Sequence, residues 1–112
     1  MKSDFQINFP PFRLDRLSGR VYQGEETIAL RPKAFAVLTY LIERRGQLAT
    51  KDELLDACWA EIAVTDTVLK VCIREIREAL GDDPSSPRFI ETAHRRGYRF
   101  IGKITEDRGT GG

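Results

Sequence analysis

Hydrophobic positions along the chain change their spacing twice, from short runs to helical periodicity and back to short runs. Residues 5–9, 12–14, 21–23 and 27–30 are short apolar runs separated by polar or proline-containing breaks. Runs of this length with such breaks are typical of strands. The segment from Phe5 to Leu30 therefore predicts a small antiparallel β-sheet, in which Pro10 and Pro11 limit the pairing between the first two strands.

Two stretches after this segment have the apolar spacing of amphipathic helices. In the first, Pro32 suits an opening helical turn and Gly46 suits the stop after the last turn. In the second, Thr50 and Glu53 stand at the spacing of a capping box. The apolar stripe of the first helix comprises Phe35, Leu38, Leu41 and Ile42, and that of the second comprises Leu54, Leu55, Cys58 and Trp59.

A third helix is predicted from an N-cap at Thr65 or Asp66 to about Leu80, just before Gly81. Its inner face is apolar and consists of Leu69, Cys72, Ile73, Ile76 and Leu80. Its outer face is mixed and consists of Thr67, Val71, Arg74 and Glu78, with Lys70 and Arg77 on one shoulder and Glu75 on the other. This difference between faces predicts that the inner face packs on a core and that the outer face is exposed.

The last apolar runs, "RFIET" and "YRFIG", flank the turn "AHRRG" and predict a β-hairpin. Gly97 is available in this turn for a backbone conformation with positive φ. Residues 88–103 contain five basic side chains and one acidic one, although the net charge of the whole chain is only +1. Any affinity for a polyanion must therefore come from the local arrangement of charge.

Composition changes this picture little: 112 residues with 41% hydrophobic and 31% charged positions predict one globular domain. We expect Cys58 and Cys72 to be reduced core residues, with a disulfide between them as the minor alternative. Neither has another Cys or His at metal-ligand spacing, so no metal or other cofactor is expected. The chain has no paired acid and base, activated nucleophile or phosphate loop, which argues against an enzyme.

The sequence has no signal-peptide pattern, and its longest mostly apolar run, 34–42, is too short to span a bilayer. We therefore expect a cytoplasmic module without membrane contact. The polar, glycine-rich end of the chain predicts a linker or tail over 103–112, after a domain over 5–102.

The order of sheet, three helices and hairpin is that of a winged helix-turn-helix. This is an α+β fold with an N-terminal antiparallel β-sheet, a three-helix core and a C-terminal β-hairpin wing. Four segments, found in order and at the family's spacing, resemble the OmpR/PhoB-type DNA-binding domain: "LRPKAFAVLTYL", "KDELLDACW", "VCIREIREALGDDP" and "FIETAHRRGYRF". Response regulators carry this domain at the C-terminus, and ToxR- and CadC-like regulators carry it at the N-terminus. With no receiver before Phe5, the second placement is expected.

The resemblance implies sequence-specific binding of double-stranded DNA by a bacterial transcription regulator, with helix 66–80 in the major groove. Val71 would then meet a thymine methyl and Arg74 would bind guanine, while Lys70 and Arg77 would hold flanking phosphates. Thr67 shares this outer face. The alternative interpretation is a solvated helix face, on which a single exposed Val is ordinary and Arg74 pairs with Glu78.

The wing, residues 92–99, is expected at the minor groove or the DNA backbone. Arg95 and Arg96 are the main candidates for this contact, and His94 occupies the position at which relatives carry a minor-groove arginine. Tyr98 is expected to pack its ring under the wing, with its hydroxyl near a phosphate. Lys51 matches a family phosphate-binding position at a helix N-terminus. A soluble hairpin tip without function is the alternative for the cluster.

Two glutamates on the third helix fit DNA poorly, because phosphates repel carboxylates. Either the docking angle turns their shoulder outward, or Glu75 binds cytosine. A winged helix used for protein contact is the alternative function. By resemblance, the 60–64 loop is a contact for RNA polymerase, although we expect Ile62 and Val64 to belong to the core. The domain is expected to be a monomer in solution and to bind direct DNA repeats in tandem.

Overall fold

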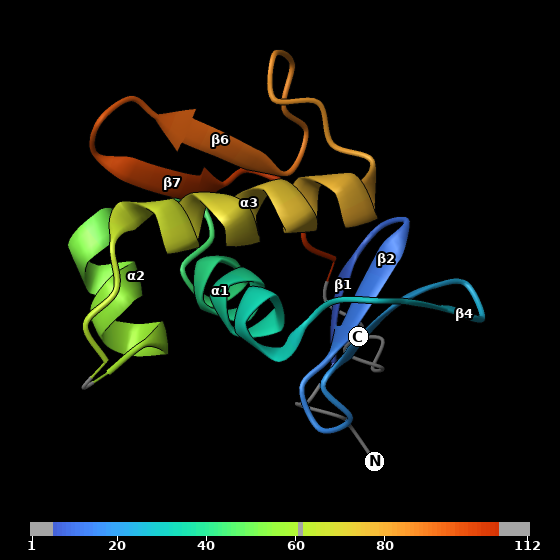
Figure 1. Cartoon of the computed structure of the whole chain (residues 1–112). Coiled ribbons are helices and arrows are strands. Elements are labelled where there is room, and N and C mark those ends of the chain that lie inside the picture. Colours follow the sequence, from blue (N-terminus) through green and yellow to red (C-terminus); the bar gives the residue numbers. More distant parts are fainter. Residues whose placement is uncertain (1–5, 61, 106–112) are drawn as a thin grey trace.

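The computed structural model describes residues 6–60 and 62–105, which form two antiparallel sheets and three helices (Figure 1). The first sheet has the strand order β1-β2-β3-β4, formed by β1 (Gln6–Phe9), β2 (Phe12–Asp15), β3 (Arg20–Gln23) and β4 (Glu26–Ile28). The helices are α1 (Pro32–Glu43), α2 (Lys51–Cys58) and α3 (Asp66–Leu80). The second sheet has the order β5-β7-β6, formed by β5 (Leu48–Thr50), β6 (Ile90–Ala93) and β7 (Gly97–Phe100). The predicted α+β winged-helix architecture is confirmed.

The layout separates the molecule into two ends. In Figure 1, α3 crosses the middle, with α1 below it and the β6–β7 hairpin above it. The tip of this hairpin and α2 lie at one end of α3, and the four-stranded sheet lies at the other end. The hairpin is the wing of the fold, and Lys51 at the start of α2 contacts both Arg96 at the hairpin tip and Asp66 at the start of α3.

Pairing between β1 and β2 differs from the expectation. The ladder runs over all four residues of each strand, from Gln6 opposite Asp15 to Phe9 opposite Phe12, and Pro10 and Pro11 form the connection with a cis peptide bond between them. The expected limit on pairing was wrong, because both prolines occupy the turn, where no ladder N–H is needed.

The predicted starts of the helices and the stop of α3 at Gly81 are confirmed, whereas α1 ends at Glu43, earlier than the stop predicted from Gly46, because the chain turns over residues 44–46. The Glu53 backbone N–H donates to Thr50 Oγ1 over 3.1 Å, and the Thr50 backbone N–H donates to Glu53 Oε1 over 3.0 Å, which completes the capping box of α2. Pro32 opens α1, and Thr65 is the N-cap of α3. Gly81 ends α3 in a left-handed conformation with φ 69°.

The core joins the helices to both sheets. All five predicted inner-face residues of α3 are buried. Phe9 from the first sheet and Phe100 from the second meet edge to face, with ring centroids 5.5 Å apart. Cys58 and Cys72 are free and buried, as expected, and burial raises the pKa of both thiols. A single core therefore fixes the wing strands to the N-terminal sheet.

Part of the predicted tail is packed against the domain. The Thr105 backbone N–H donates to the Asn8 carbonyl over 2.9 Å, and Ile104 packs against the core. Residues 106–112 of the expected linker lie outside the described residues. Within 6–60 and 62–105, none of the helices has the length and apolar character needed to cross a membrane.

Candidate nucleic-acid interface

The outer face of α3 carries exposed side chains that its buried face holds in place. Thr67, Lys70, Val71 and Arg74 are all exposed, and Val71 retains 36% of its accessible surface. Among the described residues, neither Lys70 nor Arg74 forms an ion pair, so the predicted alternative of an Arg74–Glu78 pair is not formed. These side chains can therefore meet a ligand without first breaking an internal contact.

Glu75 is engaged inside the protein. Its carboxylate accepts hydrogen bonds from the backbone N–H and from Nε of Arg31, both over 2.9 Å. Burial by itself raises the pKa of the Glu75 carboxyl, but the hydrogen bonds and charge of Arg31 together outweigh burial and hold that pKa below its ordinary value. Because Arg31 is the N-cap residue of α1, Glu75 ties α3 to the start of α1.

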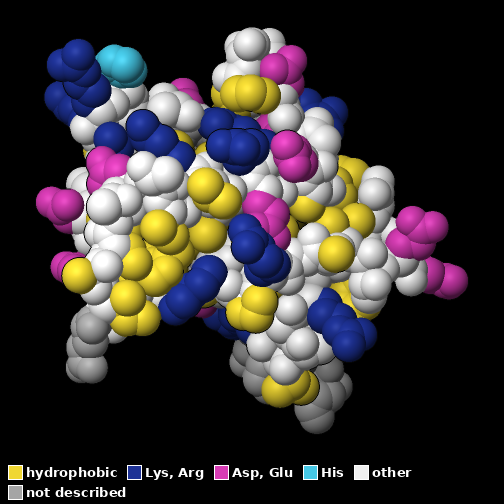
Figure 2. Space-filling model, in the orientation of Figure 1, with side chains coloured by type: hydrophobic (Ala, Val, Ile, Leu, Met, Phe, Trp, Pro, Cys, Tyr) yellow, Lys and Arg dark blue, Asp and Glu magenta, His cyan; other side chains and the backbone are white. Residues whose placement is uncertain are grey.

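The wing tip is a turn of three basic residues between the paired positions Ala93 and Gly97. The Arg96 backbone N–H donates to the Ala93 carbonyl over 2.8 Å, and His94, Arg95 and Arg96 are all exposed. In Figure 2 the dark blue of Lys and Arg lies beside the cyan of the chain's one histidine at this tip. The predicted cluster is therefore a projecting cationic tip.

Positive φ in this turn belongs to Arg95, at 66°, and Gly97 has no positive φ. The expectation for Gly97 was wrong, because glycine is needed there for a close approach instead. A Cβ atom on Gly97 would lie 2.0 Å from the Ala49 carbonyl oxygen of β5. The sequence did not indicate β5, a three-residue strand that directly precedes α2 and pairs with β7.

Lys51 lies where α2, α3 and the wing meet. Its backbone N–H donates to the Arg96 carbonyl over 3.0 Å, and its Nζ lies 3.5 Å from Asp66 Oδ2 at the start of α3. The side chain of Lys51 is 26% exposed. The predicted phosphate-binding lysine is thus close to both predicted DNA-binding elements and already has a carboxylate partner.

Arg77 and Tyr98 lie between α3 and the wing. Arg77 Nη2 donates to the Ile90 carbonyl and to Thr92 Oγ1, both over 2.8 Å. Tyr98 is 6% exposed, so its ring packs under the wing as expected. Burial is the main cause of the raised pKa of Tyr98; the carboxylate of Asp66 adds to this increase and the guanidinium of Arg77 opposes it.

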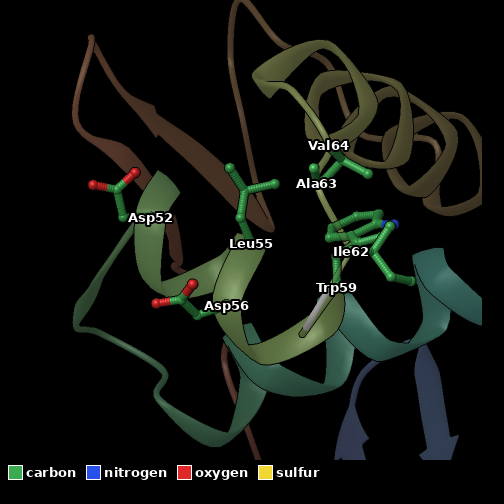
Figure 3. A pocket seen from close by; sticks show the side chains of 7 residues that line it. All are labelled: Asp52, Leu55, Asp56, Trp59, Ile62, Ala63 and Val64. Atoms are coloured by element: carbon green, nitrogen blue, oxygen red, sulfur yellow. The ribbon is translucent and has the colours of Figure 1, made fainter.

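The connection between α2 and α3 borders an open hollow of about 630 Å³ (Figure 3). Asp52 and Asp56 project from α2 on one side, and Trp59 and Ile62 lie toward the connection. Ile62 is 55% exposed, so its assignment to the core was wrong, because the short connection holds it at the rim of the hollow. Val64 is partly buried against the core.

Among the described residues, no group of three or more His, Cys, Asp or Glu side chains is placed so that it could hold a metal ion. The side chains exposed on the outer face of α3 and at the wing tip include several basic ones. They are suited to binding a polyanion.

Comparison with known proteins identifies similar domains. Residues 24–100 match the family model described as "Transcriptional regulatory protein, C terminal". The transcriptional regulator HilA of Salmonella typhimurium is 36% identical over 98 residues, which cover 88% of this chain and 17% of HilA. The chain thus spans about a sixth of this curated relative.

Two solved structures have the same fold. The RstA DNA-binding domain of Klebsiella pneumoniae, in complex with the RstA box, superposes with a TM-score of 0.77 at 29% identity, covering 86% of this chain and 96% of that one. The response regulator DrrB of Thermotoga maritima, an OmpR/PhoB homologue, gives a TM-score of 0.80 at 34% identity, covering 88% of this chain and 45% of DrrB.

Proposed function

Because this chain belongs to the family of transcriptional regulatory protein C-terminal domains, with the OmpR/PhoB type of winged helix, we propose that it binds double-stranded DNA sequence-specifically for a bacterial transcription regulator in the cytoplasm. The observation that carries the proposal is the joint presentation of two cationic elements. The outer face of α3 and the wing tip both expose basic side chains in the view of Figure 2.

In the proposed complex α3 lies in the major groove. Arg74 would donate two hydrogen bonds to guanine, and Val71 would contact a thymine methyl. Lys70 and Thr67, which lie on the same exposed face, would contact the backbone and set the register.

The wing would bind beside this groove. Arg95 and Arg96 would lie in the minor groove or against its phosphates, where local positive charge acts even in a chain of net charge +1. His94 shares the exposed tip. Lys51 would exchange Asp66 for a phosphate, because a duplex carries many closely spaced phosphate charges and their neutralisation releases bound counterions. Contact of Arg77 and Tyr98 with phosphate stays a prediction.

The test is selection of bound fragments from fragmented genomic DNA, followed by fluorescence anisotropy on the selected duplex at two salt concentrations. We expect saturable binding whose affinity falls steeply from low to physiological salt, by about tenfold for each phosphate contact per tenfold rise in salt. Binding that is independent of salt, or equal for selected and scrambled duplexes, would contradict the proposal.

A matched control is available on the N-terminal sheet. Arg20 is an exposed arginine of β3. The four-stranded sheet to which β3 belongs lies at the opposite end of α3 from α2 and the wing tip (Figure 1). Arg20→Ala removes the same charge as Arg74→Ala. We expect the Arg20 variant to keep nearly full affinity, which separates loss of a contact from loss of net charge.

A second candidate function concerns the hollow that α2 and the connection between α2 and α3 border. This surface presents the exposed side chain of Ile62 together with the carboxylates of Asp52 and Asp56. We propose that it binds a segment of RNA polymerase that has apolar and basic side chains. Ile62→Asp should then abolish activation of transcription in a reporter strain while leaving DNA affinity unchanged. Unchanged activation would remove this candidate.

The proposed assembly is a monomer in solution and a tandem arrangement on direct DNA repeats. Sedimentation of the free domain should give a single monomeric species, and a duplex with two repeats should bind two copies. A stable symmetric dimer without DNA would contradict this arrangement.

A further inference from the structure

The guanidinium of Arg77 is hydrogen-bonded inside the protein, unlike the basic groups of its neighbours on α3. Lys70 and Arg74 are exposed, whereas Arg77 Nη2 donates to the Ile90 carbonyl and to Thr92 Oγ1, each over 2.8 Å. An Nη2 group has two N–H bonds, so these two acceptors use both of them. Arg77 Nε is also buried and has no hydrogen-bond partner among the described residues.

The acceptors of Arg77 lie on the strand that leads into the wing. Thr92 pairs with Tyr98 across β6 and β7, and the turn begins at the next residue, Ala93. Among the described residues of α3, Arg77 alone is hydrogen-bonded to the two wing strands. Further polar ties of the wing strands come from outside α3: β7 pairs with β5, the Ile90 backbone N–H donates to Asp82, and the Lys51 backbone N–H donates to the Arg96 carbonyl.

We infer that Arg77 is a positioning residue, which fixes the wing relative to the recognition helix through β6. A rigid guanidinium fork suits this task, because it holds a main-chain carbonyl and a hydroxyl in one plane. The bases met by α3 and the backbone or minor groove met by the wing then lie at a spacing set before DNA arrives. This inference rests on the proposed DNA-binding function and replaces the phosphate contact predicted for Arg77. It assigns part of the specificity to a residue that binds the wing strand β6.

If Arg77 positions the wing, the contributions of α3 and the wing to DNA affinity depend on each other. If Arg77 only bound a phosphate, they would not. When α3 and the wing are held at the correct spacing, binding by one places the other at its own contact at little further entropic cost. When the hydrogen bonds from Arg77 to β6 are removed, the wing contributes less to the affinity for DNA. A residue that simply contacts a phosphate contributes the same factor whether or not the wing is intact.

The experiment is a double-mutant cycle on the selected duplex, measured by fluorescence anisotropy. Arg77→Met keeps the apolar stem and removes the hydrogen bonds, and Arg95→Ala with Arg96→Ala removes the wing charges. We expect the wing substitution to weaken binding in the Arg77→Met background by a factor at least about threefold smaller than in the wild-type background. Thermal unfolding of each variant establishes that it is folded.

Two further variants sharpen the cycle. Thr92→Val removes one acceptor of Arg77 and leaves every charge in place, so it should weaken cognate binding and lower the cost of the wing substitution in the same way as Arg77→Met. If Arg77→Met does not fold, the cycle with Thr92→Val decides. Arg74→Met is the matched control on α3, and its effect should multiply with that of the wing substitution.

A different set of results would overturn the positioning role of Arg77. If the Arg77 and wing effects multiply, if Arg77→Met lowers the salt slope by about one unit, and if Thr92→Val has no effect, then Arg77 is a phosphate ligand and the inference is overturned. Failure of the wild-type domain to bind any selected duplex would instead remove the proposed function, which the first titration of the series detects.

Discussion

Helix α3 and the wing both present basic side chains, but they hold them in different ways. The outer face of α3 is fixed by the opposite face, where Leu69, Ile73 and Ile76 are buried in the core. The wing tip has no buried side chain of its own in the turn, and its three basic residues are held by backbone pairing of Ala93 with Gly97 and of Gly97 with Thr50.

This difference suits two kinds of DNA contact. Direct contact with base edges needs side chains at a fixed spacing, which a packed helix supplies. Contact with phosphates depends mainly on charge and tolerates small displacements. Substitutions that loosen one element and leave the other intact therefore distinguish the two modes.

The largest expected effect comes from the support of α3. Ile76 is fully buried, so Ile76→Ala leaves a cavity and should lower the free energy of unfolding by about 2–5 kcal/mol. Urea denaturation followed by circular dichroism measures this change. A loss below about 1 kcal/mol would show that the core does not fix the helix as described.

The support of the wing should be sensitive to a single methyl group. Gly97→Ala places a Cβ atom 2.0 Å from the Ala49 carbonyl oxygen, so β5 and β7 must separate, at a cost of about 1–3 kcal/mol of unfolding free energy. Gly24→Ala is the control, because its Cβ meets open space at φ 66° and it should cost only about 1 kcal/mol of backbone strain. Equal losses in the two variants would contradict the close approach.

A smaller effect is expected at the wing tip, where backbone preference and side-chain charge can be separated. Arg95 has φ 66°, a conformation that glycine adopts without strain. Arg95→Gly should therefore keep the free energy of unfolding within about 1 kcal/mol of the wild type while weakening DNA binding. Arg96→Gly, at a position without positive φ, should weaken binding and also destabilise the turn. A larger loss of stability for Arg95→Gly than for Arg96→Gly would contradict this assignment.

The smallest effect is the pH-dependent contribution of the Glu75–Arg31 pair that anchors α3. Because the folded protein holds the pKa of Glu75 below its ordinary value of 4.5, the carboxylate stabilises the fold above that pH, and this contribution is lost as pH falls through the lowered pKa. Glu75→Gln should cost about 1 kcal/mol or less at pH 7. The difference in unfolding free energy between the wild type and the Glu75→Gln variant should become smaller on acidification to pH 3. A difference that becomes larger would contradict the pairing of Glu75 with Arg31.

The sequence predicted the helices well because their signals are local. The capping box of Thr50 and Glu53, Gly81 after α3 and the inner face of α3 all follow from residues within a few positions of each other. The exposed candidates Lys70, Arg74 and Arg95 followed from the same helical and hairpin periodicity.

Contacts between distant segments could not be predicted in the same way. Arg31 and Glu75 are 44 positions apart, and no local pattern marks them as partners. Asp82 lies in the connection between α3 and β6, yet it is buried and accepts hydrogen bonds from the backbone N–H groups of Arg88, Phe89 and Ile90. β5 has only three residues, too few for a sequence pattern, and it is a strand because it pairs with β7, which lies far along the chain.

The central claim is that α3 distinguishes DNA sequences while the wing mainly holds the duplex. The most direct measurement compares Arg74→Ala with Arg95→Ala plus Arg96→Ala on the selected duplex, on single-base variants of it and on random duplex, at two salt concentrations. Arg74→Ala should cost about 1–3 kcal/mol on the selected site and remove the preference at one base pair. The wing substitution should weaken all duplexes by similar factors and reduce the salt slope. A uniform loss for Arg74→Ala, with a changed base preference for the wing substitution, would contradict the claim.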